Sequence, residues 1–162
     1  MKKIIRLNNK KNNIIELFLK NIQEIFDSGY MDCMENLEII DENRINDDHY
    51  ETIRRFKSKG FLPQFIDKMI PENRPYLEYY EYAKWGLKEN ICKFYYKPIE
   101  EYYKLTGELS TNTQNDVITI VINFDLLKNI PLKSFIENTV NNLIIDRYVK
   151  IIKRIDQDFH NK

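Results

Sequence analysis

The sequence predicts a single α+β domain, mostly helical, with a small β-sheet and a long C-terminal helix. Two segments carry this prediction. Residues 117–124 are almost wholly apolar and rich in β-branched side chains, which indicates a strand buried on both faces. From Leu132 to about residue 159, apolar residues recur at three- and four-residue steps, as on one face of a helix. A length of 162 residues is ordinary for one domain, so residues 1–162 are expected to form one unit.

Helical spacing also precedes the buried strand. Residues 11–28 carry apolar side chains on one helical face, and Gly29 follows where a left-handed C-terminal cap would lie. Asp48 and Glu51 have the spacing of a capping box, in which two side chains satisfy the first N–H groups of a helix. The pattern therefore predicts a second helix from this point to Gly60.

The middle of the chain is ambiguous between helix and strand. Residues 37–40 form a short apolar run that favours a strand only weakly. Pro75 can begin a helix that continues to Tyr96. Alternatively, residues 91–96 form a strand beside 117–124, because periodicity alone does not settle so short an apolar run.

Prolines mark two further short elements. The sequence predicts one short helix from Pro63 to just before Pro71, and another from Pro98 to near Gly107. Residues 108–115 are polar and predict a surface loop.

Composition argues against several classes of protein. The apolar fraction of 43% and the charged fraction of 31% are typical of a folded, soluble chain. Cys33 and Cys92 lack the spacing of a metal site, which favours a reduced, cytoplasmic environment. The basic N-terminus precedes too short an apolar segment for a signal peptide. No run approaches the roughly 18 apolar residues of a membrane-spanning helix, so no membrane association is expected.

Charges are segregated along the chain although they sum to zero. From Glu24 to Glu51 the charged residues are acidic, opposed only by Arg44. The first twenty residues and the stretch 52–59 are predominantly basic instead. Blocks of one sign select partners, so the acidic segment predicts a protein partner with a basic surface. The simpler alternative is that these charges are solvated or paired within the fold.

Aromatic residues crowd the segment between Tyr76 and Tyr103. No single helix can bury all of them on one side, so some are expected at the surface, where Tyr and Trp act as anchors of protein interfaces. Stacking on nucleic acid is less favoured, because lysines and glutamates balance in this segment. A tyrosine-rich core with hydroxyls at its rim is an equally good interpretation.

The sequence shows no catalytic constellation. His49 and His160 are the only histidines. His49 beside Asp47 could act as a general base, but an ordinary residue in a first helical turn is the simpler interpretation. There is no phosphate-binding loop, no nucleophile elbow and no zinc-type ligand spacing. We therefore expect no enzyme, no cofactor and no metal.

Together these observations predict a non-enzymatic protein-binding module. It would be a small inhibitor or immunity-type protein of a bacterium, phage or mobile element, which occupies a partner's surface through its acidic segment and exposed aromatics. The expected partner-binding residues are Asp41, Glu42, Asp47, Asp48, Tyr79, Tyr82 and Trp85.

The alternative is a nucleic-acid-binding regulator that uses the N-terminus and basic residues in 52–59. Its phosphate contacts would be Arg54, Arg55, Lys57 and Lys59. The wide apolar face of the C-terminal helix also admits a homodimer, although burial within the same chain is the simpler interpretation.

Overall fold

The computed structural model describes residues 1–7, 13–58, 78–99, 103–112, 114, 116–127, 129 and 131–158. In these residues an antiparallel sheet of seven strands has the order β1-β7-β6-β5-β4-β3-β2. The strands are β1 (Lys2–Arg6), β2 (Met34–Arg44), β3 (His49–Ser58), β4 (Glu78–Gly86), β5 (Ile91–Pro98), β6 (Tyr103–Asn112) and β7 (Val117–Leu126). The helices are α1 (Ile14–Lys20), α2 (Ile22–Asp27) and α4 (Lys133–Asp158).

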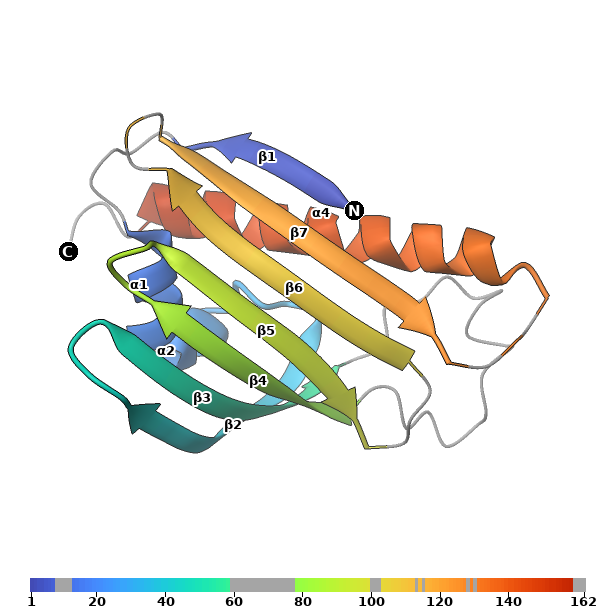
Figure 1. The fold of residues 1–162 in the computed structure, drawn as a ribbon, viewed down its shortest axis with the longest axis horizontal. Helices are drawn as coiled ribbons and strands as arrows, with labels where there is room; N and C mark the ends of the chain where they lie inside the picture. The colour runs from blue at the N-terminus through green and yellow to red at the C-terminus, as the bar shows by residue number, and fades with distance from the viewer. Residues whose placement is uncertain are drawn as a thin grey trace.

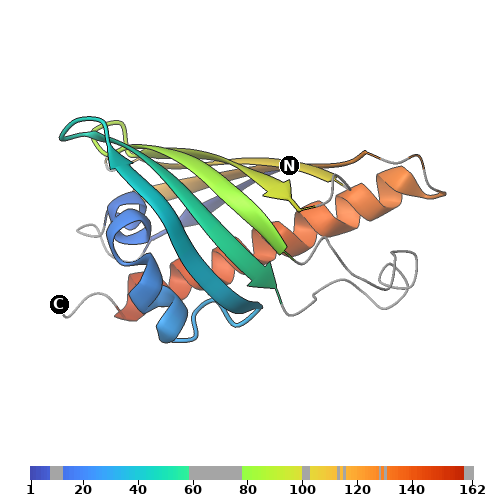
Figure 2. The ribbon, with the colours of Figure 1, turned by 90° about the horizontal axis from the view of Figure 1, so that it is seen from below.

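The sheet curls over one long helix. Figure 1 looks onto the outer face of the sheet, with α4 behind it, and Figure 2 shows the strands arching over α4 while α1 and α2 lie near one end. The inner face, which is turned toward the helices, carries the apolar core. Its fully buried members include Ile14, Ile25, Ile118, Ile120, Ile122, Ile152 and Ile155.

The predicted mostly helical fold is wrong, because the sheet dominates the structure. Asp48 lies in the loop between β2 and β3, and the predicted second helix is instead strand β3. Side chains of β3 alternate between the two faces, so that Thr52, Arg54 and Phe56 point inward and are buried. The burial of this segment therefore alternates every second residue, as in a strand, and Asp48 and Glu51 do not form a capping box.

Residues 78–98 form a hairpin of β4 and β5 rather than the predicted helix. The alternative prediction of a strand at 91–96 is correct for the element, but its neighbours are β4 and β6, not β7. Alternation again explains the strand, because every second side chain of β4 is buried against the core. These inward residues are Tyr79, Glu81, Ala83 and Trp85.

Strand β6 occupies residues 103–112, in place of the short helix predicted from Pro98 to near Gly107 and of the first part of the surface loop predicted at 108–115. Gln114 lies in a turn, as the loop prediction requires. The strand predicted at 117–124 is confirmed as β7. Only its inward face is fully buried, because Val121 is half-buried and Asn123 is exposed on the other side. The short helix predicted from Pro63 lies outside the described residues.

The predicted long C-terminal helix is confirmed as α4. The first predicted helix is divided at Asn21 into α1 and α2, and the strand favoured at 37–40 lies within β2. Val140 and Ile145 of α4 are buried within this chain, as the simpler interpretation of its apolar face expected. A homodimer through α4 stays a prediction. Among the described helices, none is long and apolar enough to cross a membrane.

Side chains of α4 also satisfy backbone groups of β7 beyond the end of its pairing with β1. The pairing ends at Val121. Further along, Phe124 donates its N–H to Asn141 Oδ1 over 3.1 Å, and Leu126 donates its N–H to Glu137 Oε1 over 2.8 Å. Because unpaired buried backbone groups are costly, these contacts fix α4 across the sheet.

Candidate functional site

A row of polar side chains crosses the inner face at the level where α4 packs against the sheet. The strand register places Arg54 of β3 opposite Glu81 of β4, and Glu81 opposite Tyr96 of β5. Helix α4 supplies the fourth member, Tyr148, whose hydroxyl lies 2.5 Å from the hydroxyl of Tyr96. Four polar side chains from three strands and one helix thus meet in an otherwise apolar interior.

Arg54 is held from several sides. Its Nη1 lies 3.5 Å from Glu81 Oε1, and the two side chains are only 2% and 9% exposed. Its Nη2 donates to the backbone carbonyls of Phe18 and Leu19 over 3.3 and 3.2 Å, at the C-terminal end of α1. The guanidinium also lies 5.0 Å from the centroid of the Trp85 ring, a cation–π distance. Arg54 therefore ties the sheet to α1.

Glu81 stands between two opposing influences. Burial raises the pKa of the Glu81 carboxyl, while the positive charge of Arg54 and a hydrogen bond from Tyr96 act to lower it. Arg54 Nε and Glu81 Oε1 have no hydrogen-bond partner within the described part of the chain. Such unsatisfied buried polar atoms are rare in native proteins and call for an explanation.

Aromatic rings surround this polar row. Phe56 and Tyr79 stack with centroids 5.6 Å apart, and Tyr79 stacks on Tyr96 at 4.5 Å. Phe94 lies 5.4 Å from Tyr96 and 5.7 Å from Tyr148. Offset stacking of this kind adds to the stabilisation from burial alone.

Gly107 of β6 makes room for one of these rings. A Cβ atom placed on Gly107 would lie 2.2 Å from Cζ of Phe94, far inside van der Waals contact. Strand β6 therefore needs a residue without a side chain opposite Phe94, its partner in the β5–β6 register.

The two hydroxyl-bearing rings at the end of the row are not completely enclosed. Tyr96 and Tyr148 point into the space between the sheet and α4, yet each keeps a partly accessible surface. Burial nonetheless raises the pKa of both hydroxyls well above the ordinary tyrosine value.

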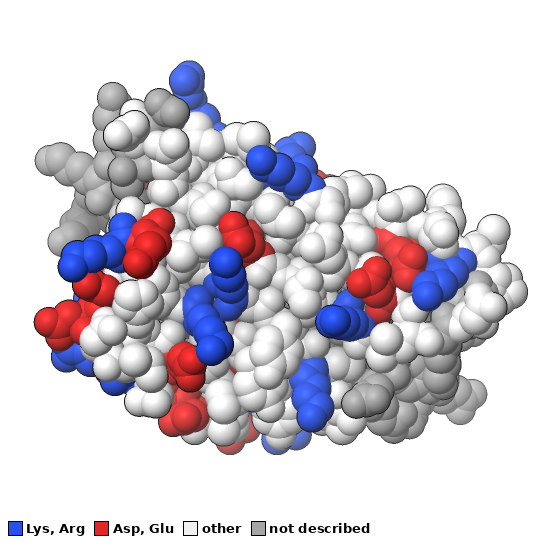
Figure 3. Space-filling view, in the orientation of Figure 1, with Lys and Arg blue, Asp and Glu red and all other residues white. Residues whose placement is uncertain are grey.

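The outer face of the same strands carries a shallow groove of about 590 Å³. Tyr82 and Tyr95 stack within it, with centroids 4.8 Å apart and an interplanar angle of 6°. Ion pairs flank the stack, including Lys84 with Glu51 at 2.8 Å. Figure 3 shows this face with both signs of charge scattered over a largely uncharged surface. Exposed pairs of this kind contribute little to stability.

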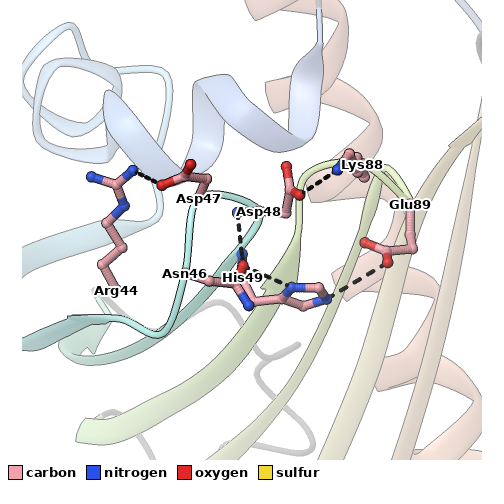
Figure 4. A network of polar contacts seen from close by, with 7 residues as sticks. All are labelled: Arg44, Asn46, Asp47, Asp48, His49, Lys88 and Glu89. Carbon is pink, nitrogen blue, oxygen red and sulfur yellow. Dashed lines mark hydrogen bonds and ion pairs between the residues drawn. The ribbon is translucent and has the colours of Figure 1, made fainter.

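Among the residues predicted as partner contacts, Asp47 and Asp48 lie at the tip of the β2–β3 hairpin (Figure 4). Asp47 forms an ion pair with Arg44, and Asp48 forms one with Lys88 over 2.8 Å. Both carboxylates thus already have a basic partner in this chain. Their role in binding a protein stays a prediction.

His49 lies in the same hairpin and not in the first turn of a helix. Its Nδ1 is 3.1 Å from Asn46 Oδ1, and its Nε2 is 3.6 Å from Glu89 Oε1. The side chain of His49 is half exposed, so no enclosed acid–base site surrounds it. No group of three or more His, Cys, Asp or Glu residues in the described ranges could hold a metal ion.

The remaining predicted contacts are divided between the two faces. Tyr79 and Trp85 are each 4% exposed on the inner face, so a protein that docks on the surface would not contact them. Tyr82 and Asp41 line the outer groove, and Glu42 is exposed on β2. An interface built on exposed aromatics therefore retains only Tyr82 of its three predicted anchors.

The residues predicted to contact nucleic acid are also divided. Arg54 is buried, whereas Arg55 pairs with Glu78 at 3.0 Å and Lys57 with Glu35 at 3.2 Å. Lys59 lies outside the described residues. Because Arg54 is buried, it does not share a surface with Arg55 and Lys57, and the nucleic-acid alternative stays a prediction.

Reasoning from sequence did not find Glu81, Tyr96 or Tyr148 as site residues. The available signal was a charged residue at an inward position of an alternating strand, such as Glu81 between Tyr79 and Ala83. This signal becomes visible only once the segment is assigned to a strand.

No protein-family model and no curated protein sequence matches this chain. Two solved structures resemble it over nearly its whole length. The protein TTHA0849 from Thermus thermophilus has a TM-score of 0.59 and 12% identity, over 97% of this chain and 92% of that one. The Zhui aromatase/cyclase from a Streptomyces species has a TM-score of 0.56 and 9% identity, over 96% and 90%.

This likeness shows a shared helix-grip fold, in which an antiparallel sheet curls around a C-terminal helix. At such low identity it shows the fold alone. Since one of the two similar proteins is an aromatase/cyclase, the fold is compatible with an enzyme. The expectation that this chain is not an enzyme therefore stays a prediction.

Proposed function

We propose that this protein binds a small, largely apolar organic molecule between the inner face of the sheet and α4. The observation that carries the proposal is the hydroxyl pair of Tyr96 and Tyr148, which points inward but remains partly accessible. Small-molecule sites are typically concave and apolar, with a few polar groups that orient the ligand. The aromatic rings around the polar row of the inner face would supply the apolar surface and the orienting groups of such a site.

The buried ion pair supports the same proposal. Two charges removed from water contribute little to stability compared with apolar residues of similar volume. Arg54 and Glu81 also keep one unsatisfied polar atom each among the described residues. A fold that needed only a stable core would be served as well by an apolar pair here, so a role in positioning Tyr96 toward a ligand is the better explanation.

The predicted inhibitor or immunity-type function rested on the size of the chain, its acidic segment and aromatic anchors at the surface. Two of the three predicted anchors, Tyr79 and Trp85, are buried, which weakens that alternative. The proposal is also compatible with the shared fold, since one of the two similar proteins is an aromatase/cyclase.

The proposal can be tested through the single tryptophan. Trp85 lies on the inner face, so its fluorescence should report a ligand that enters the interior. We expect saturable one-to-one binding of an aromatic probe such as 2-naphthol. Tyr148→Ala should weaken this binding about tenfold or more, because a removed aromatic contact is worth about 1.4 kcal/mol or more when buried.

Tyr82→Ala is the matched control, because it removes a stacked tyrosine from the outer face of the same sheet. Its affinity for the probe should equal that of the unmodified protein. Absence of saturable binding, or equal losses in the two variants, would overturn the proposal.

A further inference from the structure

The two edges of the sheet carry charges of opposite sign. Among the described strands, only β1 and β2 have a single neighbour, and Figure 1 shows them at opposite sides of the sheet. Strand β1 carries three basic residues and no acidic one, whereas β2 carries four acidic residues and one basic one. Each edge has backbone N–H and C=O groups that no described strand pairs with, and such an edge can accept a strand of another chain.

Every second residue of β1 directs its backbone groups away from the sheet. Met1 accepts a backbone hydrogen bond from β7 over 2.9 Å, and Leu7 donates one to the residue that precedes β7 over 2.8 Å. Because such bonds recur at alternate residues of an antiparallel pair, the N–H and C=O groups of Lys2, Ile4 and Arg6 point outward. Ile4 is 58% exposed, with an exposed base on either side of it. The edge of β1 is therefore an apolar side chain between two positive charges.

The regular part of the β2 edge is acidic. A bulge interrupts the pairing of β2 with β3 between Ile39 and Asp41, and pairing then continues to Arg44. Asp41 and Glu42 are exposed there and form no ion pair among the described residues, whereas Arg44 already has an acidic partner in the hairpin. Ile39 and Ile40 are 44% and 46% exposed beside them. This edge therefore offers two negative charges next to an apolar surface.

Charge decides which edges can meet. Two copies joined through β2 would bring the acidic residues of one copy against those of the other, and two copies joined through β1 would do the same with their basic residues. Like charges directly opposite each other across a strand pair are destabilising. Charged edge strands commonly prevent association for this reason. Here the opposite signs leave one attractive combination, which is β1 of one copy beside β2 of another.

We propose that a second copy of this chain docks edge to edge, with the basic β1 of one copy beside the acidic β2 of the next, so that the sheet continues from copy to copy. All six neighbouring pairs of the sheet are antiparallel, so β1 and β2 run in the same direction. A joint that keeps the outer faces of both copies on one side is therefore a parallel pair. Because the two edges differ, the interface is heterologous and each copy keeps one edge for a further copy.

Sedimentation velocity of the unmodified protein at increasing concentration measures this association. At low ionic strength we expect the average mass to rise past that of a dimer, because each copy has two edges that can bind. Added salt should lower the average mass, since it screens the contact between oppositely charged edges. The association should not depend on a ligand, because the edges are separate from the proposed interior site.

Two variants block one edge each. Ile4→Pro removes an outward N–H of β1 without changing a charge, and proline is tolerated in an edge strand where its nitrogen faces away from the neighbouring strand. Asp41→Lys with Glu42→Lys makes the β2 edge basic, like that of β1. Each variant alone should associate about tenfold or more weakly than the unmodified protein, because several cross-strand contacts are lost together. Mixed in equal amounts, the two should form dimers and nothing larger, since the mixture retains one intact edge of each kind.

Lys150→Glu with Lys153→Glu is the control, because it reverses two exposed charges on α4 and leaves both edge strands unchanged. This variant should associate like the unmodified protein. If circular dichroism shows that Ile4→Pro does not fold, the β2 variant still tests the joint. Added in excess to the unmodified protein, it should cap the β2 edge and lower the average mass toward that of a dimer.

Three results would overturn the proposal. The first is an unmodified protein that stays monomeric at millimolar concentration and low ionic strength. The second is self-association that persists undiminished in a folded variant with one edge blocked. The third is a mixture of the two edge variants that stays monomeric, because a joint between β1 and β2 must form in that mixture.

Discussion

The inner and outer faces of β3, β4 and β5 carry the same kinds of side-chain pair in opposite surroundings. Each face has an Arg–Glu pair across β3 and β4: Arg54 with Glu81 inside, and Arg55 with Glu78 outside. The inner pair is separated by 3.5 Å and almost fully buried, whereas the outer pair is closer, at 3.0 Å, with side chains 41% and 32% exposed. Burial, more than distance, distinguishes the two pairs.

Each face of these strands also carries a stacked pair of tyrosines. Tyr79 and Tyr96 stack at 4.5 Å on the inner face, and Tyr82 and Tyr95 stack at 4.8 Å on the outer face. In the inner stack, Tyr96 lies opposite the buried Glu81 in the strand register, and its hydroxyl contacts that of Tyr148 on α4. Neighbouring residues of one strand therefore have very different energetic roles, because each step along a strand reverses the face of the side chain.

The largest expected effect of this difference is on stability. Arg54→Ala leaves Glu81 buried without its counter-charge, which should reduce the free energy of unfolding by about 3–5 kcal/mol. Arg55→Ala breaks a solvent-exposed pair and should reduce it by no more than about 1 kcal/mol. Urea unfolding followed by circular dichroism measures both values. Equal losses in the two variants would show that the faces do not differ as described.

The same comparison can be sharpened by removing both charges at once. In Arg54→Met with Glu81→Leu, no unpaired charge remains, so most of the stability lost in Arg54→Ala should return. Ligand binding should not return with it, because Tyr96 then has no carboxylate to orient it. Recovery of stability without recovery of binding would separate the structural role of the pair from its proposed functional role.

A smaller effect is expected at Gly107 and its neighbour Thr106, which lie on opposite faces of β6. Gly107→Ala places a Cβ against the ring of Phe94 and should reduce the free energy of unfolding by about 1–3 kcal/mol. Phe94→Leu in the same chain should relieve part of this loss, because the shorter side chain withdraws from the new methyl group. Thr106→Ala, which faces the outer groove, should change stability by only about 0.5 kcal/mol.

The sequence predicts the long helix better than the sheet for a physical reason. Helix α4 has 26 residues, so its apolar stripe repeats over many turns and has few alternatives. In β4, by contrast, aromatic residues occupy both faces, with Tyr79 inside and Tyr80 and Tyr82 outside. The alternation of a strand is hidden when both faces carry similar side chains, and helical spacing can then be found in the same residues.

The candidate site depends on register, which no local pattern contains. Arg54 and Glu81 are 27 positions apart in the sequence and meet only because β3 pairs with β4 in one particular alignment. Tyr148 is brought to Tyr96 by the packing of α4 on the inner face, a contact between residues 52 positions apart. The sequence shows that charged residues occur in these segments, but only the folded chain shows which of them meet.

The smallest expected effect is on the pH dependence of stability, and it follows from the raised pKa of Glu81. Burial is the main cause of the rise, and Arg54 and Tyr96 offset part of it. A carboxyl with a higher pKa in the folded state keeps its proton after the unfolded chain has lost it. As pH rises from the ordinary glutamate value of about 4.3 through the folded-state pKa, Glu81 therefore makes a decreasing contribution to stability.

Glu81→Gln removes this titration. As pH rises through that window, the free energy of unfolding of the unmodified protein should therefore fall relative to that of the variant. Glu78→Gln removes one formal charge from the outer face of the same strand and controls for net charge. Urea unfolding at several pH values from 4 to 7 measures the trend. If the unmodified protein instead gained stability relative to the variant as pH rises, the charge of Arg54 would outweigh the desolvation of Glu81. The inner pair would then differ from the outer pair in burial alone.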